Sequence, residues 1–542
     1  MSTTTQPATS WHRGRVAGWI ISVDHKRVGA LYLAWAAVFL LIGGILPLLM
    51  RIQMTKPDAG FLGDSTYAGM RTMHGTLLVF FVLVPVVVGL ATYLVPLMIG
   101  ADRIERPGLA AMSLWLFGFG GAAVVLSAFA KGGSSEAGWA GYPPVAITQE
   151  GHGVDLWLIG MILLALSVLA SAANLVATIQ MRRAEGMTWP NLPVFAWSVL
   201  VWGFVSLVLV PLAALGLVLI LLERRYPGTF DFFLTDDNEV KPWLTWLFGQ
   251  SFAYAALVPV LGVLAEVVAV FGGRALANAK LLGQALVAYA GLTFVLVLYH
   301  AYAGAEGKDP SVVLLVLAVV ATIPSVVAFA LLAGTVWRAR SSIRWSAPMV
   351  FAGGALVLFA VGLLSALVLV VLGTSRDLRG TAFGSAHAHY LLWGTGLMAL
   401  LAALTYWWPK IFGRLLDRRL TWVAAVLLFV GFNFTFFFEF LLGDNGQPAS
   451  ASSFSKHGSD QAYNVISTVG AFATGLGLLL YLVAVMRSHK GRRAGNDPWH
   501  GDTLEWYTTS PPPPHNFDSL PRIASTRPVA DLRRKLQERN AL

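Results

Sequence analysis

Long stretches that contain almost no charged residue recur along the whole 542-residue chain. A stretch of about 20 apolar residues can cross the hydrocarbon core of a bilayer as an α-helix. Helices are favoured there because they satisfy their backbone hydrogen bonds internally. The sequence therefore predicts an all-α, polytopic membrane protein. The twelve expected spans are 28–50, 72–99, 109–130, 153–180, 191–222, 244–271, 281–305, 311–337, 346–373, 382–409, 421–443 and 464–486.

The composition supports this class and limits the chemistry. Hydrophobic residues make up 56% of the chain, charged residues only 12%, and cysteine is absent. A chain without cysteine has no disulfide, no thiolate metal ligand, no iron–sulfur cluster and no cysteine nucleophile. Any metal or cofactor must therefore be held by histidine, carboxylate, methionine or tyrosine side chains.

The distribution of positive charge predicts three parts and their orientation. Residues 1–27 form a polar N-terminal arm, 28–487 the membrane domain, and 488–542 a proline-rich and basic tail. An even number of spans places both ends on one side of the membrane. If that side is the cytoplasm, 21 of the 38 Lys and Arg residues lie in cytoplasmic loops and flanks, 11 lie outside and 6 lie in the far tail. Because cytoplasmic loops carry the excess of positive residues, both termini are expected in the cytoplasm.

Four of the eleven histidines fall inside predicted spans: His74, His300, His387 and His389. Ionisable groups are costly in hydrocarbon, so these four are candidates for function. The alternative for a lone residue such as His300 is a neutral imidazole that is hydrogen-bonded to a neighbouring helix. His387 and His389 are two residues apart and so point about 200° away from each other on a helix. One helix could thus serve two cofactors, and His74 can supply the second histidine that a buried bis-histidine haem needs.

Several motifs resemble, in the same order, subunit I of the haem–copper oxidase superfamily, in the cytochrome c oxidase group. They are ISVDHKRVGALYLAWAAVFLLIGGILPLLMRIQM, TMHGTLLVFFVLVPVVVGLATYLVPLMIGA, AGWAGYPP, NLVATIQMRRAEGMTWPNLPVFAWSVLV, HAHYLLWG and YWWPKIFGR. The resemblance covers nearly the whole membrane part. It implies a twelve-helix, subunit I-like bundle in a bacterial cell membrane. It also implies a place in the aerobic respiratory chain, with other oxidase subunits and a cytochrome c-like or quinol electron donor as partners, and membrane lipid around the bundle.

The same resemblance implies two haems and assigns their contacts. His74 and His389 match the axial ligands of a low-spin haem, and His387 matches the axial ligand of a high-spin haem. Arg51 matches an arginine that contacts the substituents of the low-spin haem, where a guanidinium supplies hydrogen bonds and positive charge. The alternative for Arg51 is an interface anchor at a helix end. The loop that covers the haem propionates in the family corresponds here to the loop with Trp139 and Tyr142.

The chain departs from the family at the copper that faces the high-spin haem. The family uses three histidines there, but this chain has Gln250 and Tyr299 in place of two of them, so only His300 remains. One imidazole with an amide and a phenol is a poor copper site, and copper is therefore not expected. Tyr254 occupies the position of the family's active-site tyrosine. Without a neighbouring imidazole at position 250, an ordinary buried tyrosine is the favoured alternative.

Proton routes and the propionate contacts also depart from the family. Phe252 replaces a glutamate, Arg103 an acidic entrance residue and Ala328 a lysine. Because a proton relay through a membrane needs ionisable groups along its path, proton pumping is expected to be lost. The two arginines that bind haem propionates in the family are replaced by Ala449 and Ser450.

Two functions of different classes fit these features. The first is a respiratory subunit I-like dihaem protein that passes electrons from the low-spin to the high-spin haem for dioxygen or nitric oxide chemistry. The second is a non-catalytic dihaem electron-transfer or structural subunit of a respiratory complex, so enzymatic activity stays an open question. A solute channel has only the polytopic form in its favour. The donor would dock outside, on the acidic loop with Asp231, Asp236, Asp237 and Glu239, unless that loop is merely solvated.

Overall fold

The computed structural model describes residues 17–230, 232–233, 252–305, 311–372, 378–455 and 458–540. Every regular element in these ranges is a helix. Eleven helices within them are long and apolar enough to cross a membrane, and α11 (Leu257–Gly272) is a shorter apolar helix. The first residues of the span expected at 244–271 lie outside the described ranges. The predicted all-α bundle of about twelve spans is confirmed.

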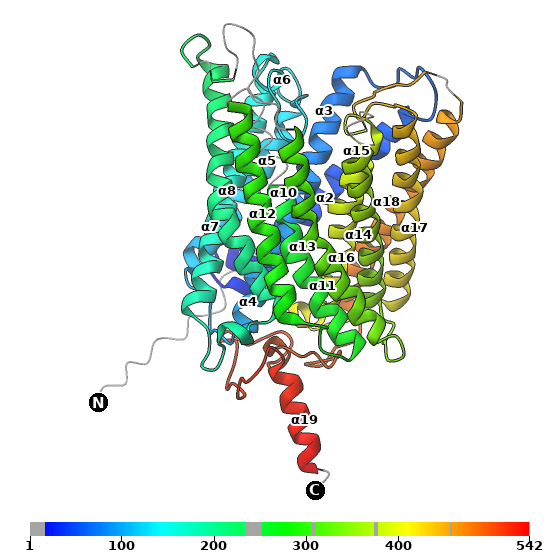
Figure 1. The fold of residues 1–542 in the computed structure, drawn as a ribbon. Coiled ribbons are helices and arrows are strands. Elements are labelled where there is room, and N and C mark those ends of the chain that lie inside the picture. The colour runs from blue at the N-terminus through cyan, green and yellow to red at the C-terminus, as the bar shows by residue number, and fades with distance from the viewer. Residues whose placement is uncertain are drawn as a thin grey trace.

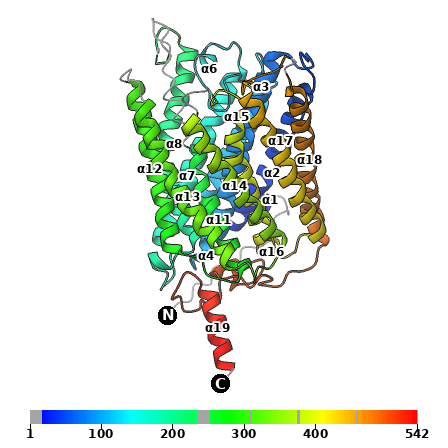
Figure 2. The same cartoon turned by 45° about the vertical axis from the view of Figure 1, so that its right-hand side comes forward.

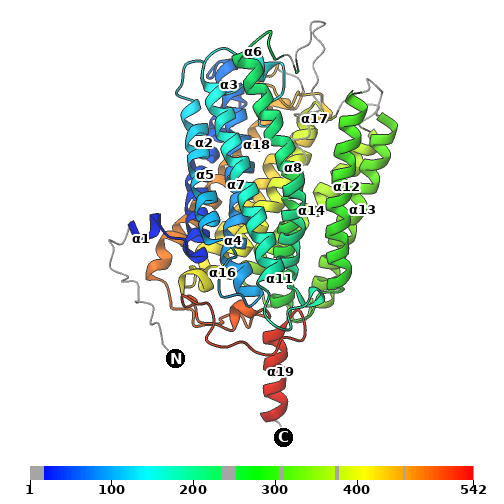
Figure 3. The same cartoon turned by 90° about the vertical axis from the view of Figure 1, so that its left-hand side faces the viewer.

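The long helices run roughly parallel to one another and form one bundle (Figure 1). In Figure 2, α2, α3, α15, α17 and α18 gather on one side, whereas α12 and α13 lie at the opposite edge, side by side again in Figure 3. The spanning elements are α2 (His25–Gln53), α3 (Asp64–Gly75), η1 (Thr76–Leu83), α4 (Val84–Met98), α5 (Pro107–Ser127), α7 (Gly153–Met181), α8 (Val194–Arg225), α12 (Ala279–Ala305), α13 (Ser311–Arg338), α14 (Ala347–Leu372), α15 (Ala382–Ala388), η4 (His389–Gly394), α16 (Thr395–Phe412), α17 (Arg418–Asp444) and α18 (Asp460–Arg487).

Short helices lie at the two ends of this bundle, except α10, which lies inside the bundle directly before α11 (Figure 1). They are α1 (Ala17–Ile20), α6 (Val145–Thr148), η2 (Trp189–Asn191), α10 (Phe252–Ala255), η5 (Ser488–Lys490), η6 (Leu504–Trp506) and α19 (Pro528–Asn540). Local sequence accounts for several helix ends. The Asp24 and Asp417 carboxylates accept backbone N–H groups at the starts of α2 and α17, as N-cap residues do. Gly273 and Gly413 end α11 and α16 with φ of 63° and 68°, the left-handed conformation that suits glycine.

Two spans contain a widened, π-helical turn beside a histidine. The continuous span of α3, η1 and α4 widens at Thr76, two residues after His74. The span of α15, η4 and α16 widens at His389 itself. The Thr395 hydroxyl donates to the carbonyl of Tyr390, five residues earlier, at 2.8 Å. π-helical turns are rare and gather at functional sites. Both turns therefore mark candidate functional positions.

The chain after α18 packs against the end of the bundle at which α2 begins. The Lys26 ammonium donates to the Asn516 side-chain carbonyl at 2.9 Å and to the Pro514 carbonyl at 3.0 Å. Nearby, the Trp407 indole N–H donates to the Glu505 carboxylate at 3.0 Å, and burial raises the pKa of Glu505 above its ordinary value. Beyond these contacts, α19 projects away from the bundle (Figure 1). Residues 488–527 therefore close this end of the membrane domain.

Candidate haem site

His74 and His389 face each other between two spans. Their ring centres are 6.4 Å apart and their ring planes differ by 13°. A metal–imidazole bond of about 2.0 Å, with the ring centre about 1.1 Å behind the nitrogen, puts two ligating rings roughly 6.2 Å apart across one metal ion. The observed spacing of the two rings thus matches that of two imidazoles on one iron, and the pair fits a bis-histidine haem.

The hydrogen bonds of the two rings fix which nitrogen is free. His74 Nδ1 is 3.1 Å from the Gly43 carbonyl, and His389 Nδ1 is 2.8 Å from the Ser385 carbonyl. A carbonyl only accepts, so each Nδ1 carries the hydrogen and each Nε2 keeps its lone pair. Metal-ligating histidines are commonly oriented in this way. Phe436 stacks on His389 with ring centres 4.1 Å apart, which restricts the ring further.

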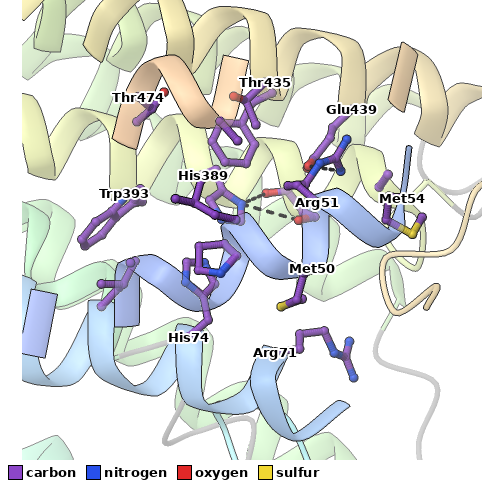
Figure 4. A pocket seen from close by; sticks show the side chains of 18 of the residues that line it. Met50, Arg51, Met54, Arg71, His74, His389, Trp393, Thr435, Glu439 and Thr474 are labelled. Carbon is purple, nitrogen blue, oxygen red and sulfur yellow. Dashed lines mark hydrogen bonds and ion pairs between the residues drawn. The ribbon is translucent and has the colours of Figure 1, made fainter. Parts of the chain in front are cut away.

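A large pocket opens around this pair, with an empty volume of about 1230 Å³ that includes the space at its mouth. Figure 4 shows His74 and His389 pointing toward each other in it, with Met50 and Trp393 nearby. Apolar side chains of α2, α16, α17 and α18 form most of the wall, and a few polar groups stand among them. An apolar cavity with a few placed polar groups is typical of cofactor sites.

Arg51 reaches this pocket from the end of α2 and is held by two helices. Its guanidinium is 3.3 Å from the Glu439 carboxylate on α17 and donates to the Asn464 carbonyl on α18 at 3.1 Å. The Arg51 and Glu439 side chains are each 12% exposed. A buried ion pair needs such further hydrogen bonds to offset its loss of hydration. The structure thus places the sequence-predicted Arg51 in the pocket and adds Glu439 as its partner.

Arg71 also lines the pocket, and the sequence analysis missed it. The expected span began at 72, which left Arg71 as a flanking residue, whereas α3 begins at Asp64. Arg71 therefore precedes His74 by three residues on one helix and shares its face. This i, i+3 spacing to a candidate ligand was the signal in the sequence that could have identified it.

His387 points to the other side of its helix. Its Nδ1 is 2.9 Å from the hydroxyl of Ser365 on α14, and that hydroxyl donates to the Gly362 carbonyl at 2.9 Å. Since the hydroxyl hydrogen is committed to Gly362, His387 Nδ1 is the donor and its Nε2 keeps the lone pair. His387 and His389 are thus directed at different neighbours, as their spacing predicts.

Most of the residues that replace the family's copper ligands fall outside the described side chains. Gln250 lies outside the described residues, as do Asp231, Asp236, Asp237 and Glu239 of the acidic loop. Tyr299 and His300 lie on α12, but their side chains are not among those described.

Tyr254 lies on α10, and its carbonyl accepts a hydrogen bond from the Tyr289 hydroxyl of α12 at 3.2 Å. In the described part of the chain, no three His, Asp or Glu residues gather as a metal site.

The loop residues Trp139 and Tyr142 lie beside the site and not in the pocket wall. Trp139 packs against Gly75, where an added Cβ would stand 2.9 Å from the Trp139 Cβ. Trp139 also lies 5.7 Å from Phe80, between ring centres. The loop therefore covers the helix next to His74, and a side chain at position 75 would push it away.

The remaining positions at which the sequence departs from the family are scattered. Arg103 is exposed and lies 3.9 Å from Asp102. Ala328 is buried in α13. Ala449 lines the haem-sized pocket near its mouth, while Ser450 is exposed. Phe252 begins α10, and its side chain is not among those described.

The fold is that of a polytopic membrane protein, and its pocket fits a haem held by two histidines. The family model described as cytochrome c and quinol oxidase polypeptide I matches residues 27–473. The chain belongs to this family, which confirms the resemblance inferred from the motifs. Its members are respiratory membrane oxidoreductases that bind haem, transport electrons and work with other oxidase subunits and electron donors.

Individual relatives agree with this assignment. The chain is 34% identical over 516 residues to cytochrome c oxidase subunit 1 of Bacillus subtilis, covering 94% of this chain and 82% of that one. It is 34% identical over 519 residues to a haem–copper oxidase subunit I+III of Aeropyrum pernix, covering 94% and 62%. A solved haem–copper terminal oxidase dimer shares its fold with a TM-score of 0.73, at 16% identity, over 86% of this chain and 84% of the other.

Proposed function

We propose that this chain is a dihaem subunit I-like protein of an aerobic respiratory complex. It passes electrons from a low-spin to a high-spin haem for dioxygen or nitric oxide chemistry, without copper ligation and without proton pumping. The observation that carries the proposal is the nearly parallel imidazole pair with ring centres 6.4 Å apart. Both rings have their Nδ1 engaged by carbonyls and so offer Nε2 to one iron.

The residues of the pocket have separate tasks in this proposal. His74 and His389 hold the low-spin haem, and the Gly43 and Ser385 carbonyls keep their rings in the ligating orientation. Arg51 offers a guanidinium to the substituents at the haem edge, at a position fixed by Glu439. The bound haem supplies one-electron chemistry, with a reduction potential set by its ligands and surroundings. The mostly apolar wall would limit the access of water to the bound haem.

The other side of the same helix holds the second haem in this proposal. His387 would hold it, with the ring oriented by Ser365. Tyr254 and His300 are the candidates for catalytic contacts on the open side of that haem, where Gln250 and Tyr299 replace the family's histidines. The loop with Trp139 and Tyr142 covers the haems from the end at which α3 begins.

Both termini lie in the cytoplasm of a bacterial cell in this proposal, which the positive-charge bias supports. The loops at the other end of the bundle then face outward, where a cytochrome c-like or quinol donor would deliver electrons. Other subunits of the complex would cover the lipid-facing helices.

Difference spectra of the purified complex test this function, together with iron and copper counts per chain. We expect a low-spin signal in the reduced-minus-oxidised spectrum, a carbon monoxide-binding haem, two haem irons and less than stoichiometric copper. One iron per chain would mean that His387 holds no haem. Stoichiometric copper with robust oxygen uptake would overturn the loss of copper.

The replaced copper residues favour a second candidate, a non-catalytic dihaem electron carrier. Both candidates share the low-spin site, so gas consumption separates them. Turnover of dioxygen or nitric oxide with a reduced donor supports the first candidate. Two haems with neither gas consumed support the second.

A further inference from the structure

We infer that Arg71 is the residue that binds a carboxylate of the haem held by His74 and His389. The inference rests on the proposed function, because it needs a haem in this pocket. Arg71 lies on α3, the helix that also carries His74. The group that it would bind is a carboxylate at the edge of the haem.

The position of Arg71 suits this task. Arg71 and His74 are three residues apart on α3, which puts them on one face with a rise of about 4.5 Å between them. Both line the same pocket, and Figure 4 shows them rising from one helix, with Arg71 on the side of Met54. A planar cofactor ligated at His74 would therefore extend one edge toward Arg71, near the mouth of the pocket.

The side chain of Arg71 is half-buried beside the Tyr67 phenol, and no hydrogen bond or ion pair of its guanidinium is found in the described part of the chain. Its Nε is buried without a hydrogen-bond acceptor, and no described carboxylate lies within ion-pair distance of its guanidinium. A buried polar group without a partner costs free energy that native proteins normally avoid. An arginine in a pocket wall that makes no hydrogen bond or ion pair with the described residues points to an anionic partner that comes from the ligand.

The charges of the pocket point the same way. Its wall contains two guanidinium groups, Arg51 and Arg71, and one carboxylate, Glu439. Glu439 is paired with Arg51, and the two histidines are neutral in the hydrogen-bonding arrangement described above. One positive charge is therefore left over, on Arg71. A carboxylate matches the planar donor fork of arginine and can form two parallel hydrogen bonds with it.

The opposite wall supplies no alternative cation. The loop after α17 lines the mouth with Gln447, Pro448, Ala449 and Ala451, none of which carries a charge. The positions at which the family resemblance places arginines hold Ala449 and Ser450. The carboxylate contact has thus moved from that loop to α3.

Substitution of Arg71 in the full complex tests the inference. Arg71→Gln removes the charge, and Arg71→Lys keeps the charge without the planar donor fork of the guanidinium. The control is Arg379→Gln, which removes an exposed arginine at the same end of the bundle that does not line the pocket. The measurements are haem content per chain, the rate of haem loss to excess apomyoglobin, and the midpoint potential of the low-spin haem.

For Arg71→Gln we expect roughly tenfold faster haem loss, the effect of one charge-assisted hydrogen bond, and a lower midpoint potential because a positive charge beside the haem is gone. Arg71→Lys should give intermediate values, and Arg379→Gln should match the unsubstituted complex. Unchanged haem loss and potential in Arg71→Gln would overturn the inference. If that variant does not assemble, Arg71→Lys decides, since values equal to those of the unsubstituted complex would contradict a role for the fork.

Failure of the proposed function looks different. In that case the unsubstituted complex shows no low-spin haem, or His389→Ala leaves the low-spin spectrum unchanged. A haem that depends on His389 but not on Arg71 rejects only the present inference.

Discussion

The two sides of the α15–η4 segment differ in how much of the family's machinery they keep. On the His389 side, a facing imidazole, an arginine and a mostly apolar pocket wall form a site whose parts fit one another. On the His387 side, the imidazole is oriented by Ser365, but the family resemblance predicts that Gln250 and Tyr299 stand in place of two metal-holding histidines. One face of this helix therefore carries a site that keeps the family's features, and the opposite face carries a site where the resemblance predicts changes.

Helix geometry explains why this separation is possible. Residues two apart on a helix contact different neighbours, so a change beside His387 need not alter the contacts of His389. Under the proposed function, electron entry at one haem and gas chemistry at the other would therefore be separable by substitution. Substitutions on the two sides should therefore have different effects.

His389→Ala should remove the low-spin haem and leave the second haem bound at His387. Without one of two facing ligands the six-coordinate state is lost, so haem iron should fall from about two to about one per chain. The low-spin signal in the reduced-minus-oxidised spectrum measures this loss. His489→Ala, which changes an exposed histidine after α18, is the control. A low-spin signal that persists in His389→Ala would contradict the assignment of that side.

His387→Ala should give the opposite pattern. We expect carbon monoxide binding to disappear while the low-spin signal is retained, because His387 and His389 face different neighbours. Carbon monoxide difference spectra of the two variants, measured side by side, make the test. Loss of both signals in His387→Ala would show that the two sides are not independent.

Restoring histidines at positions 250 and 299 probes the changed side directly. In Gln250→His with Tyr299→His, three imidazoles including His300 become available, a ligand set that copper prefers. Copper per chain should rise from a trace toward about one in the double variant, measured by metal analysis after dialysis. No gain of copper would mean that the surroundings of these positions, and not only the ligands, have changed.

Glu439→Gln should produce the smallest effect, confined to the His389 side. The substitution removes the carboxylate that offsets the charge of Arg51, so the midpoint potential of the low-spin haem should rise. The interaction of one charge at this range is worth about 1–2 kcal/mol at an intermediate effective dielectric constant, or roughly tens of millivolts. Potentiometric titration measures the shift. A lower potential, with haem content unchanged, would contradict an offsetting role for Glu439.

Hydropathy and spacing in the sequence predicted most of the fold. The absence of charge over about 20 residues identified the spans, because hydrocarbon imposes that requirement on every spanning helix. The opposed directions of His387 and His389 followed from helix periodicity alone. The ends of the spans were less predictable, since helices extend into the polar region of the membrane with charged residues such as those of α3 between Asp64 and Arg71.

The site was predictable only in part for the same reason. His74 was identified because a histidine in hydrocarbon is unusual, whereas Arg71 was overlooked because it stood one residue outside the expected span. The pairing of Arg51 with Glu439 joins residues 388 positions apart, and only the packing of α2 against α17 and α18 brings them together. The π-helical turns at Thr76 and His389 also leave no clear periodic signal in segments that are apolar on all faces.

The closing segment after α18 has a consequence for the order of events during biogenesis. Lys26 at the start of the first span bonds to Asn516, 490 residues later in the chain. At a bacterial synthesis rate of about 5–20 residues per second, that partner leaves the ribosome roughly 25 to 100 s after Lys26 does. The first helix must therefore wait in the bilayer without its final contacts until translation is nearly complete. A chain that stops before residue 516 would lack this contact and leave this end of the bundle without its cover.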